Sequence, residues 1–115
     1  METRLEQMLA HPEHATMAKA AVKLQARKLR VLGHGWHPLK HTVVGVLRHT
    51  GKLEPCVFHE VRDGWAYVTA LDNFFSSRHG GEPQRTFYKG GCWVFQLPPG
   101  QWRGVQRKYP GAERG

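Results

Sequence analysis

The fold of this chain is decided by residues 56–71, which read CVFHEVRDGWAYVTAL. The Asp63-Gly64 pair is typical of a two-residue β-hairpin turn. On either side of it the side chains alternate with a period of two, which predicts strands over 56–62 and 65–71. Strict alternation in the first strand places Val57, His59 and Val61 on one face and Phe58, Glu60 and Arg62 on the other.

Further strands are expected on both sides of this hairpin, because short apolar runs there are bounded by Gly, Pro and polar residues. A loop is expected over 76–83. Residues 85–88 and 92–97 are then expected to pair as a second hairpin around Lys89-Gly90-Gly91. The expected strands outside the first hairpin are residues 42–47, 85–88, 92–97 and 102–105.

The N-terminal third is predicted to be helical. Thr3 and Glu6 have the spacing of a capping box, which indicates a short helix over 4–10. A longer helix, rich in Ala and Leu, is expected over 12–32 with Gly33 after its last residue. The expected fold is α+β, with N-terminal helices followed by an antiparallel meander of four to five strands. A small curled barrel is the alternative form of that meander.

With 115 residues, the chain has room for one core of modest size. We expect a single basic domain over 1–105 and a polar, basic, frayed tail over 106–115. Apolar runs are too short to cross a bilayer, and the first residues carry acids where a signal peptide carries cations. A cytoplasmic location without a membrane partner is therefore expected.

The charge balance is the strongest compositional feature. Seventeen Lys and Arg residues against nine acids give a formal net charge of +8. Such a balance is typical of proteins that bind phosphates or acidic partners. We therefore expect the partner to be nucleic acid, DNA or RNA, or a protein complex that handles nucleic acid.

Cations recur along the longer helix at steps of three and four residues, which predicts a cationic ridge on one of its faces. A merely solvated face is the alternative interpretation. Aromatic residues stand beside cations near the expected later strands, and such pairs suit base stacking combined with phosphate contact. The predicted nucleic-acid contacts are Lys19, Lys23, Arg27, Arg30, Arg78, Arg85, Tyr88, Lys89, Trp102 and Arg103.

Most other rings are expected to form the core, since large side chains supply most of a small domain's buried area. Alternation assigns four aromatic residues to the core face of their strands. These are Phe58, Trp65, Trp93 and Phe95.

The histidines and cysteines do not make a recognisable metal motif. His34, His37 and His41 lie close in sequence, but no paired cysteines accompany them, and no metal or other cofactor is expected. Cys56 and Cys92 lie in apolar, strand-like segments and are expected to be reduced, buried packing residues.

Two other classes of function remain as alternatives. Size and charge are also typical of accessory proteins of bacteriophages and mobile elements, which suggests a small regulator or inhibitor that binds an acidic surface of a host protein. A histidine-dependent nuclease is the third class, because eight histidines could supply a general acid and base. No spacing singles out catalytic residues, so a non-enzymatic module is expected.

Overall fold

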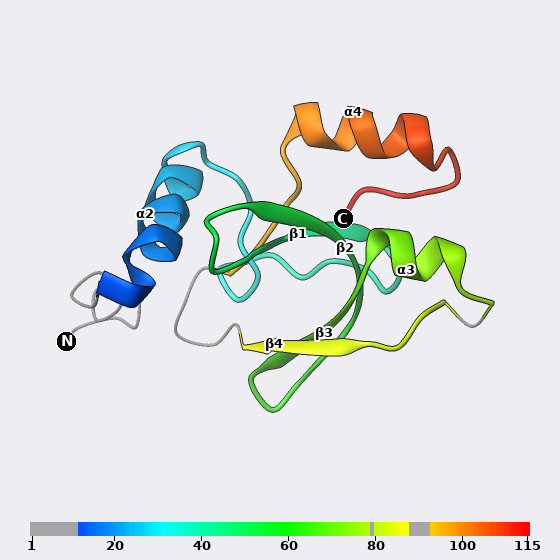
Figure 1. Ribbon diagram of the computed structural model, residues 1–115, viewed down its shortest axis with the longest axis horizontal. Helices are drawn as coiled ribbons and strands as arrows, with labels where there is room; N and C mark the ends of the chain where they lie inside the picture. Colours follow the sequence, from blue (N-terminus) through cyan, green and yellow to red (C-terminus); the bar gives the residue numbers. More distant parts are fainter. Residues whose placement is uncertain (1–11, 79, 88–92) are drawn as a thin grey trace.

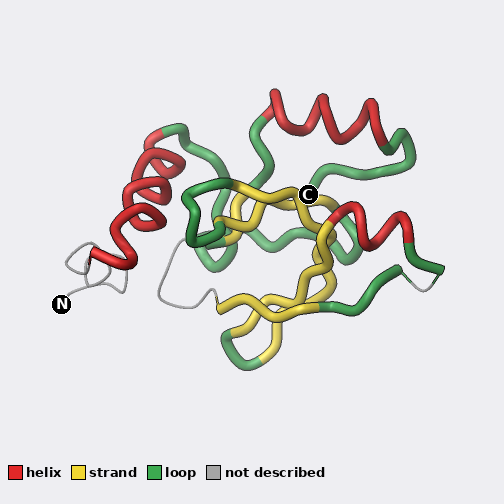
Figure 2. Tube along the Cα trace, in the orientation of Figure 1, coloured by secondary structure: helices red, strands yellow, loops and turns green. Residues whose placement is uncertain are grey.

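A computed structural model describes residues 12–78, 80–87 and 93–115. It shows an α+β fold in which helices pack against one face of an antiparallel sheet (Figures 1 and 2). The short helix expected over 4–10 lies outside the described residues. None of the helices in the described ranges is long and apolar enough to cross a bilayer. The elements are α2 (Pro12–Ala26), β1 (Val43–Leu47), β2 (Leu53–Arg62), β3 (Trp65–Ala70), α3 (Leu71–Ser76), β4 (Gln84–Phe87), β5 (Val94–Phe95) and α4 (Pro99–Lys108).

The sheet has the order β4-β3-β2-β1-β5, with every neighbouring pair antiparallel. The predicted hairpin around Asp63-Gly64 is confirmed, because β2 pairs with β3 through Arg62 and Trp65. The second predicted hairpin is wrong: β4 and β5 lie at opposite edges of the sheet. β5 pairs instead with β1, where Phe95 lies opposite Gly45. The sheet stays open, so the barrel alternative is also wrong.

The long helix ends earlier than its composition predicts. α2 ends at Ala26, and Lys28 adopts a left-handed backbone conformation with φ 59°. The following residues are extended and hydrogen-bond to β5: the Leu32 amide donates to the Val94 carbonyl at 2.9 Å. Burial of Val31 and Leu32 in this extended form outweighs the helix propensity of the segment.

The sheet has two differently covered faces. One face, here called the loop face, packs against Leu32 and Trp36 of the segment that follows α2. The opposite face, here called the helix face, packs against α2 at one end and against α3 and α4 nearer its middle. The buried side chains of the loop face are Val44, Val46, Cys56, Phe58, Ala66, Val68 and Val94. Cys56 is free and fully buried, as predicted, and burial raises the pKa of its thiol to about 12.

The C-terminal segment differs from expectation in two ways. Residues 102–105 belong to helix α4 and not to a strand, with Pro99 at the first turn, where its missing N–H costs nothing. The last residues are docked on β1 and are not frayed. The Val43 amide donates to the Glu113 carbonyl at 2.7 Å, and the Gly115 amide donates to the Val43 carbonyl at 2.9 Å. Residues 106–108 complete α4, so the chain remains packed beyond residue 105.

Candidate nucleic-acid interface

A β-bulge at His59 decides which side chains of β2 are presented on the helix face. The register runs from Phe58 opposite Val68 directly to Glu60 opposite Tyr67, which leaves His59 as the extra residue. The strict alternation predicted for β2 is therefore wrong. Phe58 and Val61 both pack toward the loop face. Glu60 and Arg62 are turned to the helix face.

Strand β3 divides its side chains cleanly between the two faces. Ala66 and Val68 are fully buried on the loop face. Trp65 and Tyr67 alternate with them and are only partly buried on the helix face. The assignment of Trp65 to the core is thus wrong, because small aliphatic residues fill that role in β3. The other three rings assigned to the core, Phe58, Trp93 and Phe95, are buried as predicted.

Two cation–aromatic pairs interleave on the helix face of β2, β3 and β4. The guanidinium carbon of Arg62 lies 4.8 Å from the Tyr67 ring centroid. That of Arg85 lies 4.5 Å from the Trp65 ring centroid. In the register, Arg62 is opposite Trp65 and Arg85 is opposite Tyr67, so each contact runs diagonally across the strands. We call these four side chains the aromatic–cation ladder.

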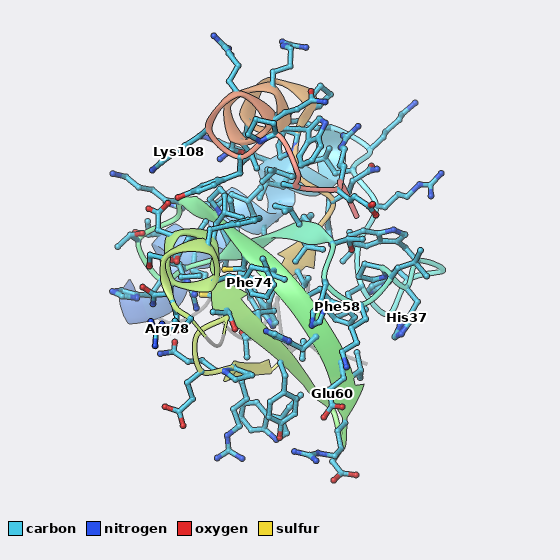
Figure 3. The ribbon with its side chains drawn as sticks, turned by 90° about the vertical axis from the view of Figure 1, so that its right-hand side faces the viewer. His37, Phe58, Glu60, Phe74, Arg78 and Lys108 are labelled. Carbon is cyan, nitrogen blue, oxygen red and sulfur yellow. The ribbon has the colours of Figure 1, made fainter. Side chains whose placement is uncertain are left out.

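The ladder lies at the end of the sheet that projects away from the helices. Figure 1 shows the β2–β3 hairpin and β4 extending away from α2 and α4. Figure 3 shows Lys108 of α4 at one end, Phe74 of α3 in the middle and Glu60 near the opposite end. Arg62 and Arg85 are exposed, and Glu60 reaches the Arg62 guanidinium at 3.7 Å. The face thus offers rings and cations together to an approaching molecule.

The predicted contact residues do not form one patch. Arg85 belongs to the ladder, whereas Arg103 is exposed on α4 and Arg78 is exposed after α3. Trp102 is half-buried against the core under α4. Tyr88 and Lys89 lie outside the described residues. The four cations predicted on the long helix are all exposed, but only Lys19 and Lys23 lie within α2; Arg27 and Arg30 follow its end.

A second cluster lies on the same face, beside the ladder. The His41 and His59 rings meet edge to face, with centroids 5.3 Å apart. His59 Nε2 lies 2.7 Å from the Thr69 hydroxyl. The Phe74 ring of α3 lies 5.6 Å from His41 and 6.2 Å from His59. Burial, followed by the nearby charges of His41 and Lys40, lowers the pKa of His59.

The three histidines that lie close together in the sequence, His34, His37 and His41, do not gather at one site in the structure. His41 contacts His59, while the His37 ring packs edge-on against Phe58 at 5.7 Å. His34, like the other two, is exposed. Within the described ranges, no three metal-binding side chains converge.

A separate cleft of about 340 Å³ separates α4 from β2, β3 and α3. Its floor includes Leu71 and Val105, and Asp72 stands at its polar side. Asp72 accepts hydrogen bonds from the Tyr109 hydroxyl and from Lys108, and these bonds lower the pKa of its carboxyl. Because the charged groups of this cleft already satisfy one another, it offers less to an anion than the ladder does.

The sequence did not lead us to expect Arg62, Trp65 and Tyr67 among the surface residues of the candidate site. The available indication was the pattern of β3, in which small aliphatic residues alternate with large aromatic ones. The histidine pair had no sequence signal, because His41 and His59 belong to different segments.

Comparison with known proteins gives no further guide: no protein family, curated protein or solved structure matches this chain.

Proposed function

We propose that this protein is a non-enzymatic module that binds single-stranded nucleic acid, alone or within a ribonucleoprotein, on the helix face of β2, β3 and β4. The observation that carries the proposal is the aromatic–cation ladder. Partly exposed rings provide surfaces on which bases stack, and arginines beside them attract the phosphates that join those bases. The proposal includes a cytoplasmic location.

Charge and strand geometry support this function. The net charge of +8 favours any polyanion and speeds its encounter with the protein. On the ladder, Trp65 and Tyr67 are separated by one residue of β3, which spaces them by about 7 Å along the strand. Both rings are fixed by packed strands and by a guanidinium, so little side-chain freedom is lost when a base stacks on them.

Binding of a fluorescent oligothymidylate or oligouridylate, followed by anisotropy over a series of salt concentrations, tests the proposal. If about five phosphates are neutralised, the log–log slope of affinity against salt should be about −3.5. Arg85→Gln should weaken binding and make this slope shallower by about 0.7, since one phosphate contact is lost. Tyr67→Leu should weaken binding several-fold while leaving the slope unchanged, because it removes stacking and no charge.

Arg107→Gln is the matched control, because it removes the same charge from the exposed surface of α4, away from the ladder. An equal loss of affinity in Arg85→Gln and Arg107→Gln would show that only net charge matters and would contradict the ladder. Absence of binding at low salt would contradict the whole proposal. Capture of an acidic protein partner that survives nuclease treatment would then favour the regulator alternative.

A further inference from the structure

His41 and His59 are held in a fixed arrangement by contacts from three parts of the chain. The His41 amide donates to the Phe58 carbonyl at 2.6 Å, and its backbone is left-handed, with φ 68°. A non-glycine residue adopts this conformation at a cost, so the surrounding structure imposes it. The His59 ring is oriented by the Thr69 hydroxyl at 2.7 Å and flanked by Phe74. The edge-to-face contact of the two imidazoles follows from these constraints.

The pair continues the ladder along the helix face. Thr69, which contacts His59, is the next residue of β3 after Tyr67 on that face. Glu60, which follows His59 in β2, lies directly opposite Tyr67. A strand of nucleic acid that stacks on Trp65 and Tyr67 and runs along β3 would therefore reach the two imidazoles.

Burial, and after it the charges nearby, disfavour protonation of His59 when no anion is present. His41 and Lys40, from the segment before β1, are the positively charged or chargeable groups that face it. Glu60 of β2 is the one negative group that acts on it among the described residues, and it also reaches Arg62 at 3.7 Å. Thr69 of β3 and Phe74 of α3 complete its surroundings without charge. A group with more positive than negative neighbours gains most from an added anion.

We infer that His41 and His59 form a phosphate subsite at the end of the ladder, which takes up protons when it holds a backbone phosphate. The inference rests on the proposed function for the source of that phosphate. Two imidazolium rings supply N–H donors to one anion, the charge of Lys40 acts on the same place, and hydrogen bonds to charged groups are the stronger kind. Proton uptake and phosphate binding are then linked, so each strengthens the other.

The first test measures oligothymidylate affinity at pH 7.5 and pH 5.5 for the full chain. For each imidazole whose pKa rises by one unit on binding, affinity gains up to about tenfold as the pH falls below the new value. His41→Gln and His59→Gln should each remove part of this gain, and the double variant should remove most of it. His49→Gln is the matched control, since His49 is exposed in the turn between β1 and β2, at the other end of β2.

The second test follows the ring resonances of the histidines by NMR as the pH changes, with oligothymidylate and, separately, with inorganic phosphate. Both ligands should raise the pKa of His59, and they should change the ring resonances of His41 more than those of His49. If the double variant binds the oligonucleotide with the same pH dependence as the parent, that result contradicts the phosphate subsite but not the proposed binding at the ladder. Failure of the oligonucleotide to bind, with phosphate still changing the ring resonances of both histidines, would contradict the proposed function and would still support the phosphate subsite. Failure of phosphate to shift either histidine, in a protein that binds no oligonucleotide, would overturn both.

Discussion

The phenol ring of Tyr109 lies stacked on the ring of Phe75, with centroids 4.4 Å apart and planes 11° from parallel. This contact joins the end of α4 to α3, and the Tyr109 hydroxyl adds a hydrogen bond to Asp72 of α3. Phe75 in turn meets Phe74 edge to face, and Phe74 flanks the histidine pair. The position of α4 is therefore connected to the site through three aromatic rings.

Tyr109→Ala is expected to lower the melting temperature, because it removes both the ring stacking and the hydrogen bond. Tyr109→Phe keeps the stacked ring and loses only the hydroxyl, so its melting temperature should lie between those of the parent and Tyr109→Ala. Differential scanning fluorimetry at neutral pH makes the comparison. Equal melting temperatures for Tyr109→Ala and the parent would show that the stacked pair does not hold α4 in place.

The last residues of the described chain are expected to contribute to stability through backbone pairing. Removal of residues 113–115 deletes both hydrogen bonds to the Val43 backbone and the Arg114 contacts to the Leu97 carbonyl. Because Val43 is buried, its amide would be left without a partner. The free energy of unfolding should fall by about 2 to 3 kcal/mol, as measured by urea denaturation.

Glu113→Gln is the control for this truncation, since it leaves the backbone in place at an exposed position. It should change the free energy of unfolding by less than ~0.5 kcal/mol. A truncated chain as stable as the parent would mean that residues 113–115 do not stay paired with β1.

How far the fold can be predicted from sequence depends on whether local or distant residues determine each element. The hairpin at Asp63-Gly64 and the strands beside it follow from local turn chemistry and alternation. The pairing of β5 with β1 does not follow from local sequence, because it places Phe95 opposite Gly45, which lies far from it along the chain. α4 carries Gly100 and Gly104, which weaken helix propensity, and it is held instead by the burial of Val105.

The candidate site was predicted less completely than the fold for a related reason. The bulge at His59 reverses which side chains of β2 face the helices, and strict alternation gives no indication of it. Cations were correctly recognised as abundant, but a count of charges does not show which of them lie beside rings. Among the predicted contact residues, Arg85 is the one whose cation lies beside an aromatic ring within the described residues.

The cations in and just after α2 give a further prediction, because they lie on a different part of the surface from the ladder. Lys19, Lys23 and Arg27 are exposed, so replacing all three with Gln should change stability by less than ~0.5 kcal/mol each. Because the proposed interface is the ladder, this variant should lose affinity only through its lower net charge, and a loss of about tenfold or more would show that this ridge also contacts phosphates. Lys19→Arg, Lys23→Arg and Arg27→Lys together keep the charge and should keep the affinity. Unfolding of the Gln variant would instead show that the ridge is packed against the protein.

Acid sensitivity of the free protein gives the last prediction, through His59. The pKa of His59 is lowered from its ordinary value of 6.5, by burial first and then by the charges of His41 and Lys40. Between the lowered value and 6.5, the unfolded chain binds more protons at this residue than the folded chain. The contribution of His59 to stability is therefore fully present above pH 6.5 and is lost as the pH falls through the folded value.

Melting temperatures of the parent and of His59→Gln, measured from pH 7.5 to pH 5, test whether stability falls on acidification because of His59. The parent should lose stability on acidification, and His59→Gln should lose less, because Gln does not titrate. His41→Gln should raise the pKa of His59 toward its ordinary value, since one of the charges that lower it is gone. His49→Gln should lose stability on acidification just as the parent does. If His59→Gln loses as much as the parent, protonation of this imidazole does not oppose folding, and its burial beside His41 has no energetic consequence.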